Sequence, residues 1–77
     1  MIEILLFAQL QEDVGSDKIT VDIAGSTVEE MKERLAEDYG LKQVTESMIA
    51  INEAYALDED TIREGDTVAI IPPVSGG

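Results

Sequence analysis

The residues with the clearest chemical potential form the segment Pro72-Pro73-Val74-Ser75-Gly76-Gly77. Two consecutive prolines remove two backbone N–H donors and favour polyproline II, so a preceding strand must end there. The last two residues have no side chains, and four residues beyond Pro73 span at most roughly 13 Å when extended. We therefore expect an extended tail over residues 74–77 that can carry a carboxylate into another protein's active site. The alternative is a frayed end, since chain termini are commonly disordered.

The rest of the chain offers little catalytic chemistry. It contains no cysteine and no histidine, which removes thiolate chemistry, the commonest zinc ligands and the commonest general base. Asp58, Glu59 and Asp60 lack the spacing of an EF-hand loop, and Ser75 has no histidine to activate it. We therefore expect that the chain catalyses nothing alone and binds no metal or cofactor.

The charge balance restricts the partners. The chain has 17 acidic and 5 basic residues and a net charge of −12. Nucleic acid and anionic membrane would both be repelled, so neither is expected as a partner. The acidity can steer the protein toward a basic partner surface, or serve solubility alone. No segment is apolar enough to span a bilayer and no signal-peptide pattern is present, so a cytoplasmic protein is expected.

The hydrophobic pattern predicts one small domain with strands and one main helix. Strands are expected at residues 2–8, 19–23, 48–51, 54–57 and 67–71, because each is an apolar or alternating run bounded by turn signals. Residues 9–17 are polar, with two apolar residues spaced like one helical turn. Residues 42–46 are expected to form a loop, and residues 58–63 a polar connector with one turn of helix.

The main helix is expected to begin near residue 27 and to end before Gly40, which suits a left-handed position after a helix. Its apolar residues recur at the helical period and should face the core. Either Ser26 with Glu29 or Thr27 with Glu30 has the spacing of a capping box. The element order then gives an α+β fold, a mixed sheet with one main helix packed on one face. This is a β-grasp, ubiquitin-like arrangement over residues 1–73.

One face of this sheet should carry exposed apolar residues. If the even-numbered residues of the first and last strands face the helix, Leu5, Phe7 and Ile71 point to the other face. First and last strands are neighbours in this arrangement, and Tyr55 can join the group. An exposed apolar patch usually marks a protein interface. The alternatives are that other residues cover it or that these are scattered surface hydrophobes.

Three segments resemble the small subunit of molybdopterin synthase: Leu5-Leu6-Phe7-Ala8, Ile51-Asn52-Glu53-Ala54-Tyr55 and residues 65–77. The similarity spans the chain, and its most specific part is the Pro-Pro-Val-Ser-Gly-Gly ending. It places the family's partner interface at Phe7, Tyr55 and Ile71, in agreement with the strand alternation. Gln11 stands where relatives often carry a basic residue, so any contact made there in relatives is not carried over.

The resemblance implies a sulfur-carrier role. An ATP-using enzyme of the ubiquitin-activating type would adenylate the Gly77 carboxylate, which is then converted to a thiocarboxylate. The tail (Val74, Ser75, Gly76 and Gly77) would insert into the large catalytic subunit of a heterotetramer. There it would donate sulfur to cyclic pyranopterin monophosphate and so form the dithiolene of molybdopterin.

Three other functions remain open at this point. A ubiquitin-like modifier would be conjugated to proteins through Gly77. A sulfur carrier of thiazole (thiamin) synthesis would share the two final glycines, although the Pro-Pro-Val-Ser lead is atypical of that group. An acidic binding module with a frayed end is the third alternative.

Overall fold

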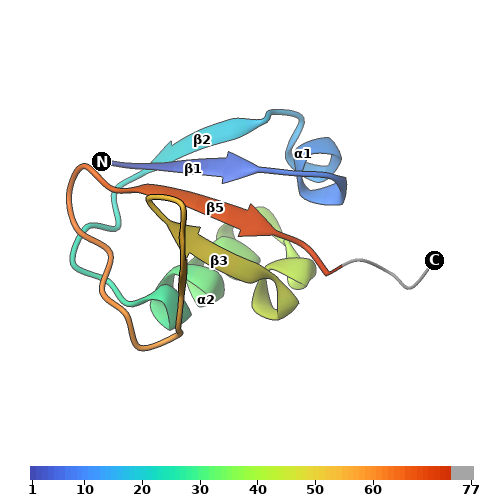
Figure 1. Cartoon of the computed structure of the whole chain (residues 1–77). Coiled ribbons are helices and arrows are strands. Elements are labelled where there is room, and N and C mark those ends of the chain that lie inside the picture. Colours follow the sequence, from blue (N-terminus) through green and yellow to red (C-terminus); the bar gives the residue numbers. More distant parts are fainter. Residues whose placement is uncertain (74–77) are drawn as a thin grey trace.

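The computed structural model describes residues 1–73, and the tail expected over residues 74–77 lies outside the described residues (Figure 1). The elements in chain order are β1 (Ile2–Leu6), α1 (Gln9–Val14), β2 (Lys18–Val21), α2 (Val28–Tyr39), the 3₁₀ helix η1 (Lys42–Glu46), β3 (Met48–Ile51), β4 (Ala54–Ala56) and β5 (Thr67–Ile71). None of the helices within residues 1–73 has the length and apolar character that crossing a membrane requires.

The strands form one mixed sheet in the order β2-β1-β5-β3-β4. β1 pairs in parallel with β5, and the other pairs are antiparallel. α2 lies behind the sheet in Figure 1, and the face turned toward the viewer is free of it. The expected mixed sheet with one main helix on one face is confirmed.

The core lies between the sheet and α2. β1 and β5 bury alternate residues, as the sequence predicts, because successive side chains of a strand point to opposite faces. α2 contributes an apolar stripe at the helical period. The largest fully buried side chains are Ile2, Ile4, Leu6, Leu10, Met31, Leu35, Ile62, Ile70, Val28, Val44 and Val68.

The ends of α2 follow from local sequence. Thr27 is the N-cap: its Oγ1 accepts from the Glu30 backbone N–H at 3.2 Å, and the Glu30 carboxylate accepts from the Thr27 backbone N–H at 2.8 Å. Of the two capping boxes that the sequence allows, the structure therefore has the one at Thr27. Gly40 ends the helix at φ 67, a left-handed conformation that glycine adopts without a Cβ penalty.

The connector at residues 58–63 is not helical, so the prediction of a helical turn there is wrong. The carbonyls of Asp58 and Asp60 accept from the backbone N–H groups of Glu29 and Val28, at 3.0 and 2.9 Å. These are first-turn amides of α2, which have no partner within their own helix. Lys32 also donates to the Asp58 carboxylate at 2.8 Å. The connector thus caps α2 instead of forming a turn of its own.

Strand β2 covers Lys18–Val21 instead of residues 19–23, and two other local predictions differ from the structure. β1 ends at Leu6 instead of residue 8, because Ala8 has φ 52 and the chain turns directly into α1. The segment expected to be a loop at residues 42–46 is η1, which buries Val44 against the core. None of these differences moves a strand to the other face of the sheet.

Candidate functional site

The open face of the sheet carries a row of side chains that crosses four strands. Leu5 of β1 lies opposite Ala69 of β5, Ala69 lies opposite Ala50 of β3, and Ala50 lies opposite Tyr55 of β4. Residues directly opposite one another in neighbouring strands share one face of a sheet. The register therefore places two small alanines in the centre of this face, between larger side chains.

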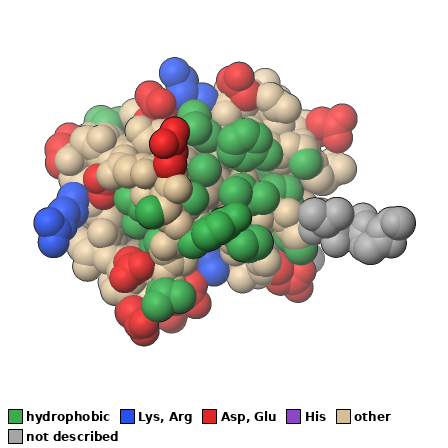
Figure 2. Space-filling model, viewed as in Figure 1, with side chains coloured by type: hydrophobic (Ala, Val, Ile, Leu, Met, Phe, Trp, Pro, Cys, Tyr) green, Lys and Arg blue, Asp and Glu red, His purple; other side chains and the backbone are tan. Residues whose placement is uncertain are grey.

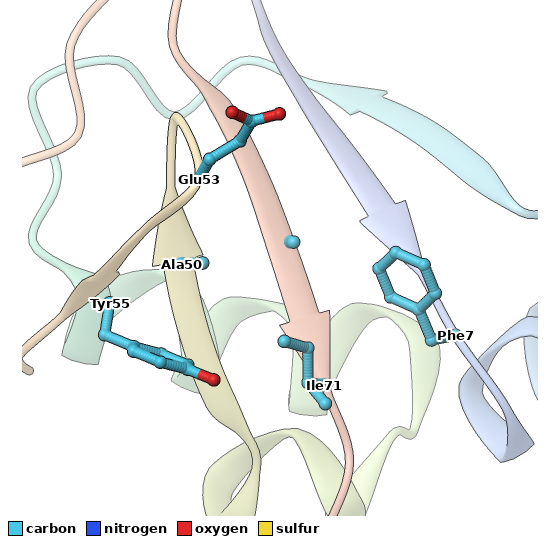
Figure 3. Close-up of a pocket in the computed structure, with 6 residues that line it drawn as sticks. Phe7, Ala50, Glu53, Tyr55 and Ile71 are labelled. Carbon is cyan, nitrogen blue, oxygen red and sulfur yellow. The ribbon is translucent and has the colours of Figure 1, made fainter.

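The small central residues leave a hollow. An open depression of about 500 Å³ occupies this part of the sheet face. We call it the sheet-face depression; its lining residues are Phe7, Ala50, Glu53, Tyr55, Ala69 and Ile71. Figure 3 shows Phe7 and Tyr55 on opposite sides of it, with Ile71 between them at one end and Glu53 at the other.

Large apolar side chains at and beside the depression are exposed. Phe7 is 45% exposed, Tyr55 is 74% exposed, and Met48, which pairs with Ile71, is 52% exposed. Figure 2 shows hydrophobic side chains gathered over the middle of this face, with charged side chains mostly around them. Within residues 1–73 no helix covers the face. Contiguous apolar exposure of this kind is typical of a protein interface.

The sequence-predicted interface residues lie on this face, but not all in one hollow. Phe7, Tyr55 and Ile71 line the sheet-face depression. Leu5 lies in an adjoining depression of about 380 Å³ that shares Ala69 and Glu53 with the first. Phe7 and Tyr55 are exposed, as strand alternation predicts for Phe7, whereas Leu5 and Ile71 are half-buried. The role of these residues in docking stays a prediction.

Sequence reasoning missed three residues of this surface: Met48, Ala50 and Glu53. Alternation along β3 could have placed Met48 and Ala50 on the open face, because Ile49 between them is buried. The position of Glu53 depends on the turn between β3 and β4. No local pattern indicated that this turn reaches over the sheet face.

Hydrogen bonds hold the turn between β3 and β4 against the start of β5. The Asn52 backbone N–H donates to the Thr67 carbonyl at 2.8 Å, and the Thr67 N–H donates to Asn52 Oδ1 at 3.0 Å. Asn52 Nδ2 donates to the Asp66 carboxylate at 2.9 Å. A backbone N–H from Arg63, together with this amide, lowers the pKa of Asp66 below its usual value. The turn is therefore fixed at one end of the depression.

The depression adjoins the start of the C-terminal segment. Ile71 is both the last residue of β5 and a lining residue of the depression, and Pro72 follows directly. Val74, Ser75, Gly76 and Gly77, the tail residues expected to insert into a partner, lie outside the described residues. Gln11 is exposed on α1. Among residues 1–73 no three acidic side chains gather closely enough to hold a metal ion.

The fold is a ubiquitin-like β-grasp domain. The chain superimposes on SAMP1 of Haloferax volcanii with a TM-score of 0.80 and 28% identity, over 99% of this chain and 98% of the other. It shares the fold, at a TM-score of 0.68 and 23% identity, with a complex of subunits 1 and 2 of the molybdopterin-converting factor from Helicobacter pylori, covering 99% of this chain and 97% of the matched one.

Sequence comparison then gives the family. Residues 4–77 match the model of the ThiS family, and the chain belongs to that family. Its relatives include the molybdopterin synthase sulfur carrier subunit of Dictyostelium discoideum, 40% identical over 97% of this chain and 94% of that protein. The Escherichia coli protein of the same name is 33% identical over the full length of both. The resemblance to small subunits of molybdopterin synthase is thereby confirmed.

Proposed function

We propose that this chain is the sulfur-carrier subunit of a molybdopterin synthase and that the Gly77 carboxylate carries the sulfur. The observation that supports this most is the exposed apolar depression whose lining residue Ile71 leads directly into Pro72-Pro73. A docking face and a reactive tail would then share one strand. Relatives aligned over almost the whole chain are named as such carriers.

The chemistry begins with activation of Gly77. A carboxylate is a poor electrophile, so an adenylating enzyme of the ubiquitin-activating type would first join it to AMP from ATP, with release of pyrophosphate. A sulfur nucleophile from a donor then attacks the acyl carbon and AMP leaves, which yields the thiocarboxylate. The missing side chains of Gly76 and Gly77 would let nucleotide, sulfur and acyl carbon meet in a narrow channel. ATP is used by the activating enzyme, and this chain would bind no cofactor.

Sulfur transfer would take place on the large catalytic subunit. The thiocarboxylate sulfur bonds to a carbon of cyclic pyranopterin monophosphate while an oxygen substituent leaves that carbon. Water then cleaves the acyl–sulfur bond and returns Gly77 as a carboxylate. Two such transfers supply the two sulfurs of the dithiolene. The matched Helicobacter pylori protein is described as a complex of two subunits, which supports a large-subunit partner. The family resemblance implies a heterotetramer, and we propose that it acts in the cytoplasm.

Docking and insertion would support each other. Glycine loses more conformational entropy on ordering than other residues, so threading the tail is costly alone. Burial of the apolar side chains around the sheet-face depression can offset that cost. Once the face is docked, the tail enters its channel at a high effective concentration. A face of modest size can therefore hold a productive complex.

A second candidate function is protein modification through Gly77. Haloferax volcanii SAMP1, which is 28% identical to this chain, is described as a small archaeal modifier protein. Carrier and modifier would share every step up to the activated glycine. They differ in the acceptor. The carrier would transfer its sulfur to a carbon of the substrate, whereas the modifier would transfer its acyl group to a lysine amine.

The role of Gly77 is tested by changing the length of the tail. Deleting Gly77, or adding one residue after it, should abolish ATP-dependent thiocarboxylation because the acyl carbon no longer reaches the activating site. Intact mass before and after incubation with the activating enzyme, ATP and a sulfur donor reports replacement of one oxygen by sulfur. Circular dichroism checks that the fold is unchanged. Normal loading of either variant would contradict the carrier proposal.

A further inference from the structure

Glu53 places a carboxylate at the edge of the apolar face. It lines both the sheet-face depression and the adjoining depression that contains Leu5. Figure 3 shows its side chain extending from the turn between β3 and β4 toward β5, at the opposite end of the depression from Ile71. Any surface that covers this face therefore also meets the Glu53 carboxylate.

The backbone at Glu53 is unusual for glutamate. Ile51 pairs with Ala54, so Asn52 and Glu53 form a two-residue hairpin turn, and their φ values are 50 and 70. Positive φ at both central residues is the type I′ pattern, which favours asparagine followed by glycine. Glutamate here carries a conformational cost that glycine would avoid. Strained residues of this kind concentrate at functional sites.

The Glu53 carboxylate has no partner among residues 1–73. Glu3 lies on the same face of the sheet, but the Lys18 ammonium stands 3.7 Å from its carboxylate. The other ion pairs of the described chain join the N-terminal amine to Glu64, Lys32 to Asp58 and Arg34 to Asp38. Glu53 takes part in none of these ion pairs and in none of the hydrogen bonds that the described residues form. Its turn is nevertheless fixed by the bonds from Asn52.

Docking would take this carboxylate out of water. A charge removed from water without a partner is costly, so an apolar or acidic surface opposite Glu53 would be disfavoured. A lysine or arginine opposite Glu53 would compensate the lost hydration, and a guanidinium could bind both carboxylate oxygens. The net charge of −12 favours a basic partner as well.

We infer that Glu53 is a specificity residue: it selects a protein surface that presents a lysine or arginine beside the apolar side chains that fill the sheet-face depression. The inference rests on the proposed function, in which the large subunit provides that surface. The apolar residues supply affinity for any matching surface, whereas Glu53 penalises surfaces without the cation. The hydrogen-bonded turn holds the backbone of Glu53 at this edge before the partner arrives.

The test measures, by titration calorimetry, the affinity of this chain for the large subunit from the same organism. Glu53→Gln keeps the size of the side chain and removes its charge, and should weaken binding about tenfold. Glu53→Lys should weaken it about 100-fold or more, because two cations would then face each other. Glu33→Lys is the matched control: it changes the net charge equally from an exposed position on α2, and should alter binding about twofold or less.

Glu53→Gly separates specificity from stability. Because glycine suits a positive φ, this variant should keep or raise the melting temperature while weakening binding about as much as Glu53→Gln. A lower melting temperature for Glu53→Gly together with weaker binding would assign Glu53 a structural role and overturn the inference. Unchanged binding of Glu53→Lys would also overturn it. If Phe7→Asp weakens binding in the same assay but Glu53→Lys does not, the sheet face is still the docking surface and only the role of Glu53 is wrong. If neither variant weakens binding, the proposed function itself fails.

Discussion

Replacing Phe7 with aspartate should separate docking from folding. Phe7 follows β1, lines the sheet-face depression and is 45% exposed in the free domain. A partner that covers the depression would bury the exposed part of its ring. The substitution removes that apolar area and places a charge opposite a partner surface that is complementary to an apolar side chain.

The magnitude follows from the exposed area. A phenylalanine side chain offers roughly 200 Å², so 45% exposure leaves roughly 90 Å² for a partner to bury. At about 25 cal/mol per Å², that area contributes about 2 kcal/mol to binding, or roughly 30-fold in affinity. Burial of an unpaired aspartate adds a further cost of about 2 kcal/mol or more. Together these terms are about 4 kcal/mol, so binding to the large subunit should weaken roughly 1,000-fold.

Tyr39→Asp is the matched control. Tyr39 is 42% exposed, close to the value for Phe7, but it ends α2 on the other side of the sheet. Both substitutions should lower the free energy of unfolding by about 1–2 kcal/mol, because each side chain is half-buried. Only Phe7→Asp should weaken binding. Calorimetric titration gives the affinity, and urea denaturation gives the stability.

Two results would refute this reasoning. If Phe7→Asp binds the large subunit as tightly as the unchanged chain, the sheet-face depression is not the docking surface. If the variant instead loses most of its stability, Phe7 belongs to the folding core and not to a binding surface.

Two further predictions concern hydrogen bonds that stabilise the fold. Thr27→Ala removes the side chain that accepts from the Glu30 N–H and should cost about 1 kcal/mol in the free energy of unfolding, measured by urea denaturation. The lowered pKa of Asp66 means that its charged form stabilises the fold above the ordinary value of 3.8, and that this stabilisation is lost as the pH falls through the lower folded value. Asp66→Asn should therefore lower the melting temperature at neutral pH, with a smaller difference from the unchanged chain below pH 3.8. An equal difference at both pH values would contradict the assignment to Asp66.

Much of the fold was predictable because its signals are local. Alternation along β1 and β5 set which side chains face α2, and the spacing of Thr27 and Glu30 marked where α2 begins. The connector at residues 58–63 was predicted wrongly because its carbonyls serve the amides of Val28 and Glu29, about 30 residues away in the chain. A hydrogen bond between residues so far apart in the chain cannot be predicted from a short window of sequence.

The candidate site was predictable in part for the same reason. Alternation places Phe7 and Ile71 on the open face without any knowledge of the partner strands. The hollow between them and Tyr55 depends on Ala50 and Ala69 lying opposite each other, which requires the register of β3 against β5. The position of Glu53 requires the geometry of the turn. Strand register and turn geometry are tertiary properties, and the sequence pattern alone did not supply them.

The most direct test of the central claim is a single-turnover reconstitution. The thiocarboxylated chain is mixed with the large subunit and cyclic pyranopterin monophosphate, and both products are followed by mass spectrometry. We expect that molybdopterin forms and that the chain returns with a free carboxylate at Gly77. Recovery of the chain mainly as covalent adducts on lysines of the other protein, with no molybdopterin formed, would contradict it and favour the modifier function.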